Sequence, residues 1–389
     1  MSGMGDDRLK IVIGSVFSLP PFSPGIAWTW LELVCGLRAL GHEVYFVEEV
    51  DPEWCRDRSG RPVSFERSLN QSRFIEAMER FGLLSSACQI YNGGEATAGL
   101  TMRQLETAMS GADLLINISG HVKCDVVLGS VSRRAYFDQD PVFTQLWLAE
   151  YGVKLNFEPD DFLLTVGLNI GTPHSPVPDG GLRWHPSLPA IMLEYWPSTT
   201  AHDDGRFTTI ASFGSYAELE FQGRRYGTKQ DEFVRVADLA MMVEQELEVA
   251  LRAPTGDPAV ERLRDRGWHL VEATSLDTLT AYQDYIAASR AEIGIAKHAY
   301  VQGNSGWFSD RTAHYLASGK PVLAQSTGYE RCLPTGEGLL TFRTVEEAAD
   351  GIAQINADYA KHCRAARAFA EEFLDHRKVL PPIIEEAMA

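Results

Sequence analysis

Short apolar runs alternate with longer amphipathic stretches along this sequence, and that alternation restricts the fold more than any other feature. Residues 8–14 form an apolar run typical of a strand, residues 25–39 have helical periodicity, and residues 43–47 form another apolar run. Gly41 follows the predicted helix in the position that favours a left-handed cap. Strand, helix and strand in this order are the repeating unit of a parallel sheet covered by helices. The sequence therefore predicts an α/β fold.

The same opening occurs twice in the chain. The predicted strands at residues 8–14 and 207–213 both run into a Gly-Ser pair. A chain of 389 residues is long enough for two α/β cores. Between the two openings, residues 195–205 are polar and bounded by Pro and Gly, as a domain link would be. We therefore expect two similar domains.

The alternation continues behind each opening, without a low-complexity segment. Further apolar runs predict strands at residues 113–118, 161–166, 268–272, 291–295, 321–325 and 339–342. Helical periodicity predicts helices at residues 275–289, 310–317 and 344–373.

Charge and composition argue against several classes of protein. The chain has 35 basic and 53 acidic residues, a net charge of −18, whereas nucleic-acid binding depends on cations, so we expect no nucleic-acid partner. No apolar run reaches the roughly 18 residues that a membrane span needs. The start lacks the basic residues and the long apolar segment of a signal peptide, which predicts a cytoplasmic protein. The six cysteines are scattered without a CxxC pair, so we expect reduced thiols and no bound metal or cofactor.

The residues with the clearest chemical meaning lie between positions 303 and 324. A loop rich in glycine and serine leads into the helix predicted from Asp310, with Ser309 as a suitable N-cap. Free backbone N–H groups at such a helix start suit a diphosphate, and Gly306 would let the backbone approach it closely. Gly306, Ser309, Asp310 and Arg311 are therefore candidate diphosphate-binding residues. An ordinary capped helix is the alternative interpretation.

Four short motifs accompany this loop and the first predicted strand–helix–strand unit. They are Ala-Ser-Gly-Lys-Pro-Val at residues 317–322, Thr-Gly at 327–328, Glu-Gly-Leu-Leu at 337–340 and Leu-Arg-Ala-Leu-Gly-His-Glu-Val at 37–44. In this setting they resemble the GT-B glycosyltransferases, in particular the family-4-like, or group 1, enzymes. The first motif is the more specific, and the last is weaker.

The resemblance implies a fold of two facing Rossmann-like domains. A domain at residues 1–198 would bind the acceptor, and a domain at residues 199–365 would bind the donor. A helical segment at residues 366–389 would pack back on the first domain. The implied activity is the transfer of a sugar from a nucleotide-diphosphate sugar to an acceptor.

The sequence departs from that family at the donor site. Retaining members often carry two glutamates eight positions apart, and the corresponding positions here hold Gly306 and His314. Asp310 lies one helical turn before His314 and is the candidate replacement for binding sugar hydroxyl groups. The stereochemical outcome of the transfer is therefore left open.

A basic cluster at residues 223–229, Gly-Arg-Arg-Tyr-Gly-Thr-Lys, precedes the donor motifs. It resembles the Arg and Lys with which GT-B enzymes hold the leaving diphosphate, which implies this role for Arg224 and Lys229. Cleavage of the sugar–phosphate bond builds charge on the nucleotide, and without a metal, cationic side chains and helix-start amides must stabilise that charge. A solvated hairpin tip is the alternative interpretation. Lys297 is either a further cation of this site or a structural residue.

Candidate residues in the first half of the chain follow predicted strands. Gly14 and Gly25 bracket the loop after the first strand, where doubly wound sheets bind ligands, and we assign both to the donor. The loop lacks GxGxxG, which argues against a dinucleotide cofactor. His121 is a candidate base or sugar contact because imidazole titrates near neutrality, although a structural histidine is the more frequent case.

Two carboxylates and a long loop complete the candidates. Asp138 and Asp140 alternate along one strand and would face the same side, with Asp138 deprotonating the acceptor and Asp140 binding it. Asp140 could instead cap a helix beginning at Pro141. His174 lies in a loop at residues 171–181 that is rich in Pro and Gly, of the kind that often forms a lid, and is a candidate acceptor contact.

The leading hypothesis is a metal-independent glycosyltransferase whose partners are a nucleotide-diphosphate sugar and a small-molecule acceptor. The negative charge, together with Asp138 and Asp140, favours a natural-product or aminoglycoside-like acceptor. Two alternatives are a nucleotide-sugar epimerase or hydrolase of the same fold, and a non-catalytic two-domain ligand-binding protein. The donor sugar, the nucleotide base and the oligomeric state, for which a homodimer is one option, are left open.

Overall fold

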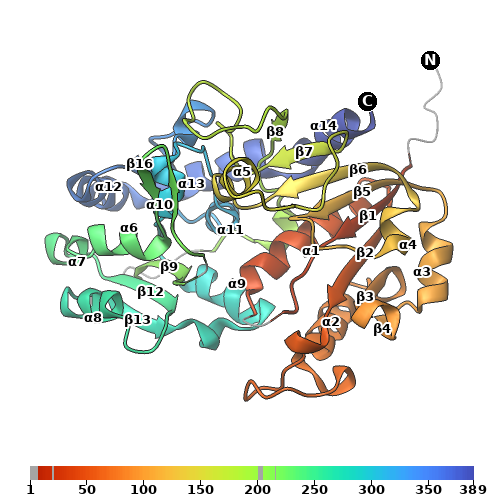
Figure 1. Cartoon of the computed structure of the whole chain (residues 1–389). Helices are drawn as coiled ribbons and strands as arrows, with labels where there is room; N and C mark the ends of the chain where they lie inside the picture. Colours follow the sequence, from red (N-terminus) through yellow and green to blue (C-terminus); the bar gives the residue numbers. More distant parts are fainter. Residues whose placement is uncertain (1–7, 20–21, 200–204, 215) are drawn as a thin grey trace. The chain divides into compact units, whose positions relative to one another are not determined.

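The structure is a computed structural model, and it describes residues 8–19, 22–199, 205–214 and 216–389. The chain divides into two compact units, each assembled from segments that are distant in the sequence. Unit 1 consists of Met1–Gln139, Lys154–Leu164 and Leu380–Ala389, and unit 2 consists of Asp140–Val153 and Thr165–Val379. Both units combine a sheet with helices (Figure 1).

Unit 1 is built on a sheet with the strand order β4-β3-β2-β1-β5-β6-β7. Strand β1 is central and pairs in parallel with β2 and β5, and its apolar run is fully buried, as expected for a strand covered on both faces. The strands are β1 (Lys10–Gly14), β2 (Glu43–Val50), β3 (Ala87–Tyr91), β4 (Ala96–Gly99), β5 (Ala112–Ile118), β6 (Val131–Asp138) and β7 (Phe162–Thr165). The helices are α1 (Pro24–Ala39), α2 (Leu69–Arg80), α3 (Met102–Met109) and α4 (Asp125–Leu128).

Unit 2 is built on a parallel sheet with the strand order β13-β12-β9-β14-β15-β16, and it also contains the antiparallel hairpin β10–β11. The strands are β8 (Trp184–Pro186), β9 (Phe207–Ser212), β10 (Leu219–Phe221), β11 (Arg224–Tyr226), β12 (Leu247–Arg252), β13 (His269–Glu272), β14 (Ala291–Gly294), β15 (Val322–Gln325) and β16 (Leu339–Phe342). The helices are α5 (Phe143–Ala149), α6 (Lys229–Arg235), α7 (Leu239–Met242), α8 (Pro258–Asp265), α9 (Leu279–Ala288), α10 (His298–Gln302), α11 (Asp310–Ala317), α12 (Val345–Ala357) and α13 (Tyr359–Phe369).

The predicted α/β class with two parallel sheets is confirmed, and most predicted elements lie within a residue or two of their observed bounds. The helix predicted at residues 344–373 is two helices, because Asp358 leaves helical geometry and its carboxylate accepts a hydrogen bond from the Lys361 N–H (3.3 Å) at the start of α13. The helix predicted from residue 275 begins only at Leu279, since Thr278 caps it by accepting from the Ala281 N–H (3.1 Å).

The two units differ from the expected domains, which had boundaries at residues 198 and 365. Residues 140–153 and 165–198, expected in the first domain, belong to unit 2. The last helix, α14 (His376–Met388), enters unit 1 at Leu380, and there the Ala387 carbonyl oxygen accepts from the Arg133 guanidinium (3.4 Å). The expected domain link at residues 195–205 lies partly outside the described residues, which omit 200–204.

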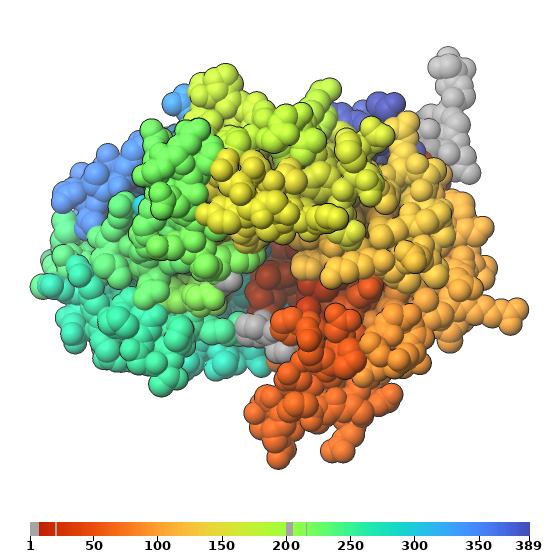
Figure 2. Space-filling model, in the orientation of Figure 1, coloured from red at the N-terminus to blue at the C-terminus, as the bar shows by residue number. Residues whose placement is uncertain are grey.

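Two features concern the surface of the chain. Among the residues that the structure describes, no helix combines the length and the apolar character that crossing a membrane requires. In unit 1, residues 52–62 after β2 are mostly exposed and project from the rest of the unit (orange in Figures 1 and 2).

Candidate functional site

Lys229 is the first residue of α6, and the backbone just before it is fixed by α10. The Gly227 N–H donates to Nδ1 of His298 (3.0 Å), and the Gly227 carbonyl oxygen accepts from the Ala299 N–H (3.0 Å). The Thr228 carbonyl oxygen accepts from the His298 N–H (3.0 Å). These three bonds tie the start of α6 to the loop after β14 and so set the position from which the Lys229 side chain extends.

Three cations of unit 2 interact electrostatically at this point, and we name Lys229, Lys297 and Arg311 the cationic cluster. Lys297 follows β14, and Arg311 lies in the first turn of α11. The Lys229 ammonium lies 6.0 Å from the ring centre of Trp307, the residue that follows Gly306. Because like charges raise each other's free energy when they are brought together, such a cluster favours an anion among them.

Lys297 is held by a carboxylate and by aromatic rings. Its ammonium donates to Oδ1 of Asp140 (2.5 Å) and to the Tyr300 hydroxyl (2.9 Å). It also lies 4.4 Å from the ring centre of Tyr216 and 5.3 Å from that of Phe143 in α5, as cation–π contacts do. The position of Lys297 is thus set by residues from three stretches of unit 2, around positions 140–143, 216 and 300.

Asp140 receives more hydrogen bonds than the sequence led us to expect. Besides Lys297, the Tyr300 hydroxyl donates to Oδ1 (2.7 Å) and the Tyr216 hydroxyl donates to Oδ2 (2.8 Å). Burial alone would raise the pKa of Asp140, but the Lys297 charge and these bonds lower it. The boundary between the units falls between Asp138 and Asp140, and Asp140, predicted to bind the acceptor, pairs with Lys297 instead.

Arg311 is also fixed in an ion pair. Its Nε donates to Glu292 Oε1 (2.5 Å) and its Nη1 to the Ile210 carbonyl oxygen (2.6 Å). The other Glu292 oxygen accepts from the Thr312 hydroxyl (2.7 Å), and the Glu292 side chain is fully buried in β14. Arg311 therefore contributes positive charge to the cluster from a fixed position.

Lys229 differs from the other two cations. Its side chain is half-buried, and no hydrogen bond or ion pair joins its ammonium to another residue of the described ranges. Burial and the charges of Arg311 and Lys297 lower the pKa of Lys229 to about 7, against the opposing effect of Asp310 and Glu292. A lysine in this state is typical of a functional site.

The loop before α11 does not act as predicted. The Gly306 N–H donates to the Thr327 carbonyl oxygen (2.7 Å), and the Gly306 carbonyl oxygen accepts from the Leu168 N–H (3.3 Å). Gly306 has φ of +72°, and a Cβ atom there would lie 2.7 Å from the backbone nitrogen of Asn169. The Gly306 amide is therefore already bonded within the protein and is not a free donor for a phosphate, contrary to prediction. Gly306 is glycine because two backbone segments meet there.

The start of α11 agrees with prediction in position but not in its cap. The helix begins at Asp310, as predicted, but Ser309 makes no side-chain cap and its hydroxyl instead contacts Asp310 Oδ1 (3.3 Å). His314, at the position of the second family glutamate, is fully buried, with its ring stacked on Trp196 (4.3 Å between centres) and its Nδ1 3.1 Å from the Tyr282 hydroxyl. His314 is therefore a core residue. Asp310 stays the candidate carboxylate of α11 for binding a sugar hydroxyl group.

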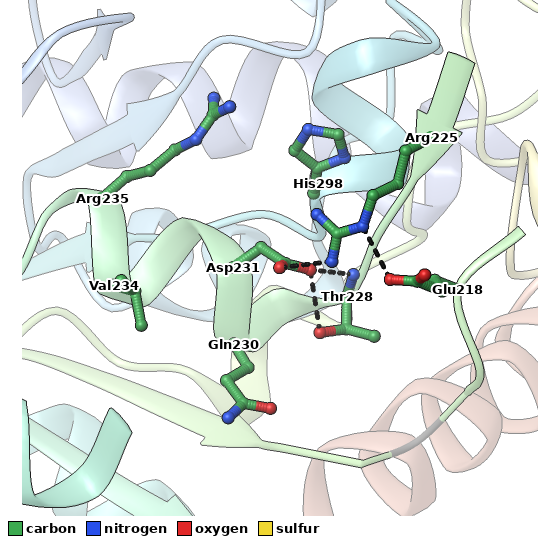
Figure 3. A pocket seen from close by; sticks show the side chains of 8 residues that line it. All are labelled: Glu218, Arg225, Thr228, Gln230, Asp231, Val234, Arg235 and His298. Atoms are coloured by element: carbon green, nitrogen blue, oxygen red, sulfur yellow. Dashed lines mark hydrogen bonds and ion pairs between the residues drawn. The ribbon is translucent and has the colours of Figure 1, made fainter. Parts of the chain in front are cut away.

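The basic residues of the hairpin separate into different roles. Arg224 in β11 is exposed. This agrees with the alternative interpretation of the basic cluster as a solvated hairpin tip. Arg225 forms ion pairs with Glu218 and Asp231 (2.6 Å each). Figure 3 shows Arg225 and Thr228 directed toward Asp231, beside a pocket of about 510 Å³. Its lining is Glu218, Arg225, Thr228, Gln230, Asp231, Val234, Arg235 and His298.

In unit 1, the predicted residues lie around the end of β1. The Asn117 side chain bonds both the N–H and the carbonyl oxygen of Val122 (3.0 Å each), which fixes the turn that carries the exposed His121. A Cβ atom on Gly14 would lie 2.5 Å from the Val122 side chain, so Gly14 makes room for this turn. Asp138, at the end of β6, is fully buried.

The two remaining predicted residues lie in different units. Gly25 is in the first turn of α1 in unit 1, and its carbonyl oxygen accepts from the Thr29 hydroxyl (3.0 Å). His174 belongs to unit 2, where its side chain is exposed and its carbonyl oxygen accepts from the Asn304 amide (2.8 Å).

Sequence reasoning missed two carboxylates at the end of β2. Oε1 of the fully buried Glu48 accepts from the N–H groups of Phe17 (2.6 Å) and Ser18 (2.9 Å). Oε1 of Glu49 accepts from the N–H groups of Lys123 and Cys124 (2.6 and 2.7 Å). The signal was the acidic pair at the end of an otherwise apolar strand, a place where carboxylates need a structural reason.

Comparisons with known proteins bear on the fold. No protein-family model matches this sequence, and no curated protein matches it. HepE of Anabaena, solved with UDP-glucose, is 13% identical to this chain, with 97% of this chain and 99% of HepE covered and a TM-score of 0.58. An α-glucosyltransferase solved with UDP is 12% identical, with 98% and 100% covered and a TM-score of 0.59. AviGT4, a glycosyltransferase involved in avilamycin A biosynthesis, is 14% identical, with 98% and 97% covered and a TM-score of 0.50.

These matches extend over nearly all of each chain, and the structures matched are glycosyltransferases with two Rossmann-like domains. The fold is GT-B. The predicted fold class is thereby confirmed. Within this GT-B chain, the cationic cluster lies in unit 2, which contains the whole of the predicted donor domain.

Proposed function

We propose that this protein is a metal-independent glycosyltransferase that moves a sugar from a nucleotide-diphosphate sugar to a small-molecule acceptor. The observation that carries the proposal is the cationic cluster, above all Lys229, whose charge has no partner among the described residues of unit 2. Two neighbouring cations make the place of Lys229 favourable for a multiply charged anion. The diphosphate of a sugar nucleotide is an anion of this kind.

The proposed chemistry needs charge stabilisation more than any covalent step by the protein. When the bond between sugar and phosphate breaks, negative charge grows on the diphosphate. Lys229 would contact its oxygens, while Lys297 and Arg311 contribute charge from positions already fixed by Asp140 and Glu292. Fixed cations stabilise a developing charge without reorganising during the reaction. The first-turn N–H groups of α11 would add further donors.

Further roles are proposed for residues outside the cluster. Asp310, the carboxylate in the first turn of α11, would bind a hydroxyl of the ribose or the donor sugar. His121 and Asp138 of unit 1 remain the proposed catalytic residues, and His174 a proposed acceptor contact. Asp140 is assigned to holding Lys297 instead of the acceptor, because its carboxylate already accepts three hydrogen bonds.

Chemistry and the matched structures support a choice of donor and acceptor classes to test. HepE and the α-glucosyltransferase were solved with UDP-glucose and UDP, which makes a UDP-sugar the first donor to test. The net charge of −18 favours a neutral or cationic acceptor over an acidic one. An aminoglycoside-like or other natural-product core meets that condition, and AviGT4 takes part in the biosynthesis of one natural product.

The test is the release of UDP from UDP-sugars, measured with and without a panel of amine-bearing and neutral acceptors. We expect UDP release that depends on an acceptor and a product heavier by one sugar. Lys229→Met should lower the rate, whereas Lys361→Met, which removes an exposed lysine on α13, should not.

The same assay separates the alternatives. Conversion of the UDP-sugar that is independent of the acceptor would identify an epimerase or hydrolase. Binding of UDP-sugars without any turnover would identify a ligand-binding protein. Failure to bind any nucleoside diphosphate would overturn the proposal itself.

A further inference from the structure

Within the part of the chain that the structure describes, two of the three cations in the cluster are paired with a carboxylate of the protein, and Lys229 is not. Lys297 pairs with Asp140 at 2.5 Å, and Arg311 pairs with Glu292 at 2.5 Å. Both cations are therefore already paired with a carboxylate of the protein. Lys229 has no such pair within the described ranges, so a ligand can change its charge state.

Four charged groups interact electrostatically with Lys229. Arg311 and Asp310 belong to α11, Lys297 lies in the loop after β14, and Glu292 lies in β14 itself. The Glu292 carboxylate is shared between Arg311 and Thr312, so little of its charge is left for Lys229.

The acidic residues of α6 itself are also occupied. Asp231 accepts from Arg225 and Thr228, and Glu232 accepts from the Gln325 amide (2.6 Å). Asp310 of α11 contributes a negative charge that opposes the lowering of the Lys229 pKa, but burial and the two neighbouring cations outweigh it. The arrangement keeps Lys229 close to losing its proton while the site is empty.

We propose that a nucleoside diphosphate binds the cationic cluster together with a proton taken up by Lys229. This inference rests on the proposed function. The neutral amine accepts the proton from solvent on its lone pair, no covalent bond to the ligand forms, and the resulting ammonium donates to the diphosphate oxygens. When the diphosphate leaves, the proton returns to solvent.

The expected size of the effect follows from the charge states. The pKa of the free Lys229 is lowered to about 7, so the amine is about half neutral at pH 7 and almost fully neutral at pH 8.5. A terminal phosphate has its second pKa near 6 and is fully ionised above pH 7.5, so the ligand does not itself exchange protons there. Proton uptake should rise from about half a proton at pH 7 toward one at pH 8.5.

The experiment is calorimetry of UDP binding to the full chain at pH 7.0, 7.75 and 8.5, in buffers with different ionisation enthalpies. The dependence of the observed enthalpy on the buffer gives the number of protons taken up. We expect the affinity of the natural protein for UDP to fall by about tenfold per pH unit toward pH 8.5.

Two variants at one position locate the proton. Lys229→Arg keeps a permanent charge, so we expect UDP binding with no proton uptake and an affinity independent of pH from 7 to 8.5. Lys229→Met cannot take up the proton, so we expect weaker binding at pH 7 and the same loss of pH dependence. Lys229→Met gives the decisive result if the larger arginine blocks UDP.

The outcomes separate this inference from the proposed function. UDP binding without proton uptake, or equal uptake in Lys229→Arg and the natural protein, would overturn the inference and leave the proposed function standing. Equal uptake in the variant would point to another group, with His298 the first to test. No UDP binding at any pH would overturn the proposed function.

Discussion

The loops that follow the strands are held by carboxylates in unit 1, whereas in unit 2 they contribute cations. In unit 1, Glu48 and Glu49 at the end of β2 accept backbone N–H groups from two neighbouring loops. In unit 2, the loop after β14 contributes Lys297, which interacts with Lys229 and Arg311. Two sheets of similar design thus use opposite charges for different purposes. Buried carboxylates satisfy backbone donors within the protein, but clustered cations favour an anion from outside.

The ion pair of Arg311 gives the largest expected effect on stability. Glu292→Ala removes the carboxylate from a buried guanidinium and should lower the free energy of unfolding by about 3–5 kcal/mol, because the charge is left unpaired. Glu292→Gln retains an oxygen that can accept from Arg311 and should cost less. Urea unfolding of both variants checks the difference. A loss below about 1 kcal/mol in Glu292→Ala would show that Arg311 is not held as described.

The corresponding test in unit 1 is Glu48→Ala. It leaves the buried N–H groups of Phe17 and Ser18 without their acceptor, which should cost about 1–3 kcal/mol for each group that stays unpaired. UDP affinity should change little, because we place the diphosphate in unit 2. Urea unfolding and UDP titration of the same variant check both parts. A loss of UDP affinity comparable to that of Lys229→Met would contradict the division of roles between the units.

Glu48 also makes a prediction about pH. Burial raises the pKa of Glu48, so the native state holds its proton more tightly than the unfolded chain does. The stability of the natural protein relative to Glu48→Gln should therefore fall as pH rises from the unfolded pKa of about 4.3 to the higher native pKa, and stay constant above it. Stability curves of both proteins from pH 4 to pH 8 test this sign.

Lys320 is a buried lysine of unit 2 outside the cationic cluster, and it tests burial without like charges. Its side chain is fully buried without a hydrogen-bond partner among the described residues, and burial lowers its pKa to about 8. The unfolded chain therefore binds the proton more tightly, and stability relative to Lys320→Met should rise by about 1.4 kcal/mol per pH unit between pH 8 and pH 10.5. Thermal unfolding of both proteins at several pH values checks this prediction. If their difference in stability does not change with pH, burial does not lower the pKa of Lys320 as described.

Arg224 gives the smallest expected effect. From the sequence, Arg224 and Lys229 have equal claims on the diphosphate, but Arg224 is exposed on the hairpin. Exposed charges contribute about 0.2–1 kcal/mol, so Arg224→Ala should change UDP affinity by about fivefold or less. A larger loss, measured by titration, would mean that the hairpin contacts the diphosphate directly.

How much the sequence predicts depends on the range of the interactions involved. The strand–helix alternation predicted β1, α1 and α11 closely, because local periodicity and chain reversals determine these elements. It also named Lys229 as a diphosphate-binding candidate, but it gave Arg224 an equal claim. It did not place Asp140 beside Lys297, since that pair joins residues 157 positions apart through the fold. Gly306 was misread for the same reason, because its φ and its contact with Asn169 arise only when two distant segments meet.

The most direct test of the account compares UDP with uridine in the natural protein and in Lys229→Met at pH 7. The account holds that the cationic cluster of unit 2 binds the diphosphate, so the variant should lose about 10- to 100-fold in affinity for UDP. This corresponds to about 1.5–3 kcal/mol for a charge-assisted hydrogen bond. Its affinity for uridine, which lacks phosphates, should stay within about twofold of the natural protein. Equal losses for both ligands, or no loss for UDP, would contradict the account.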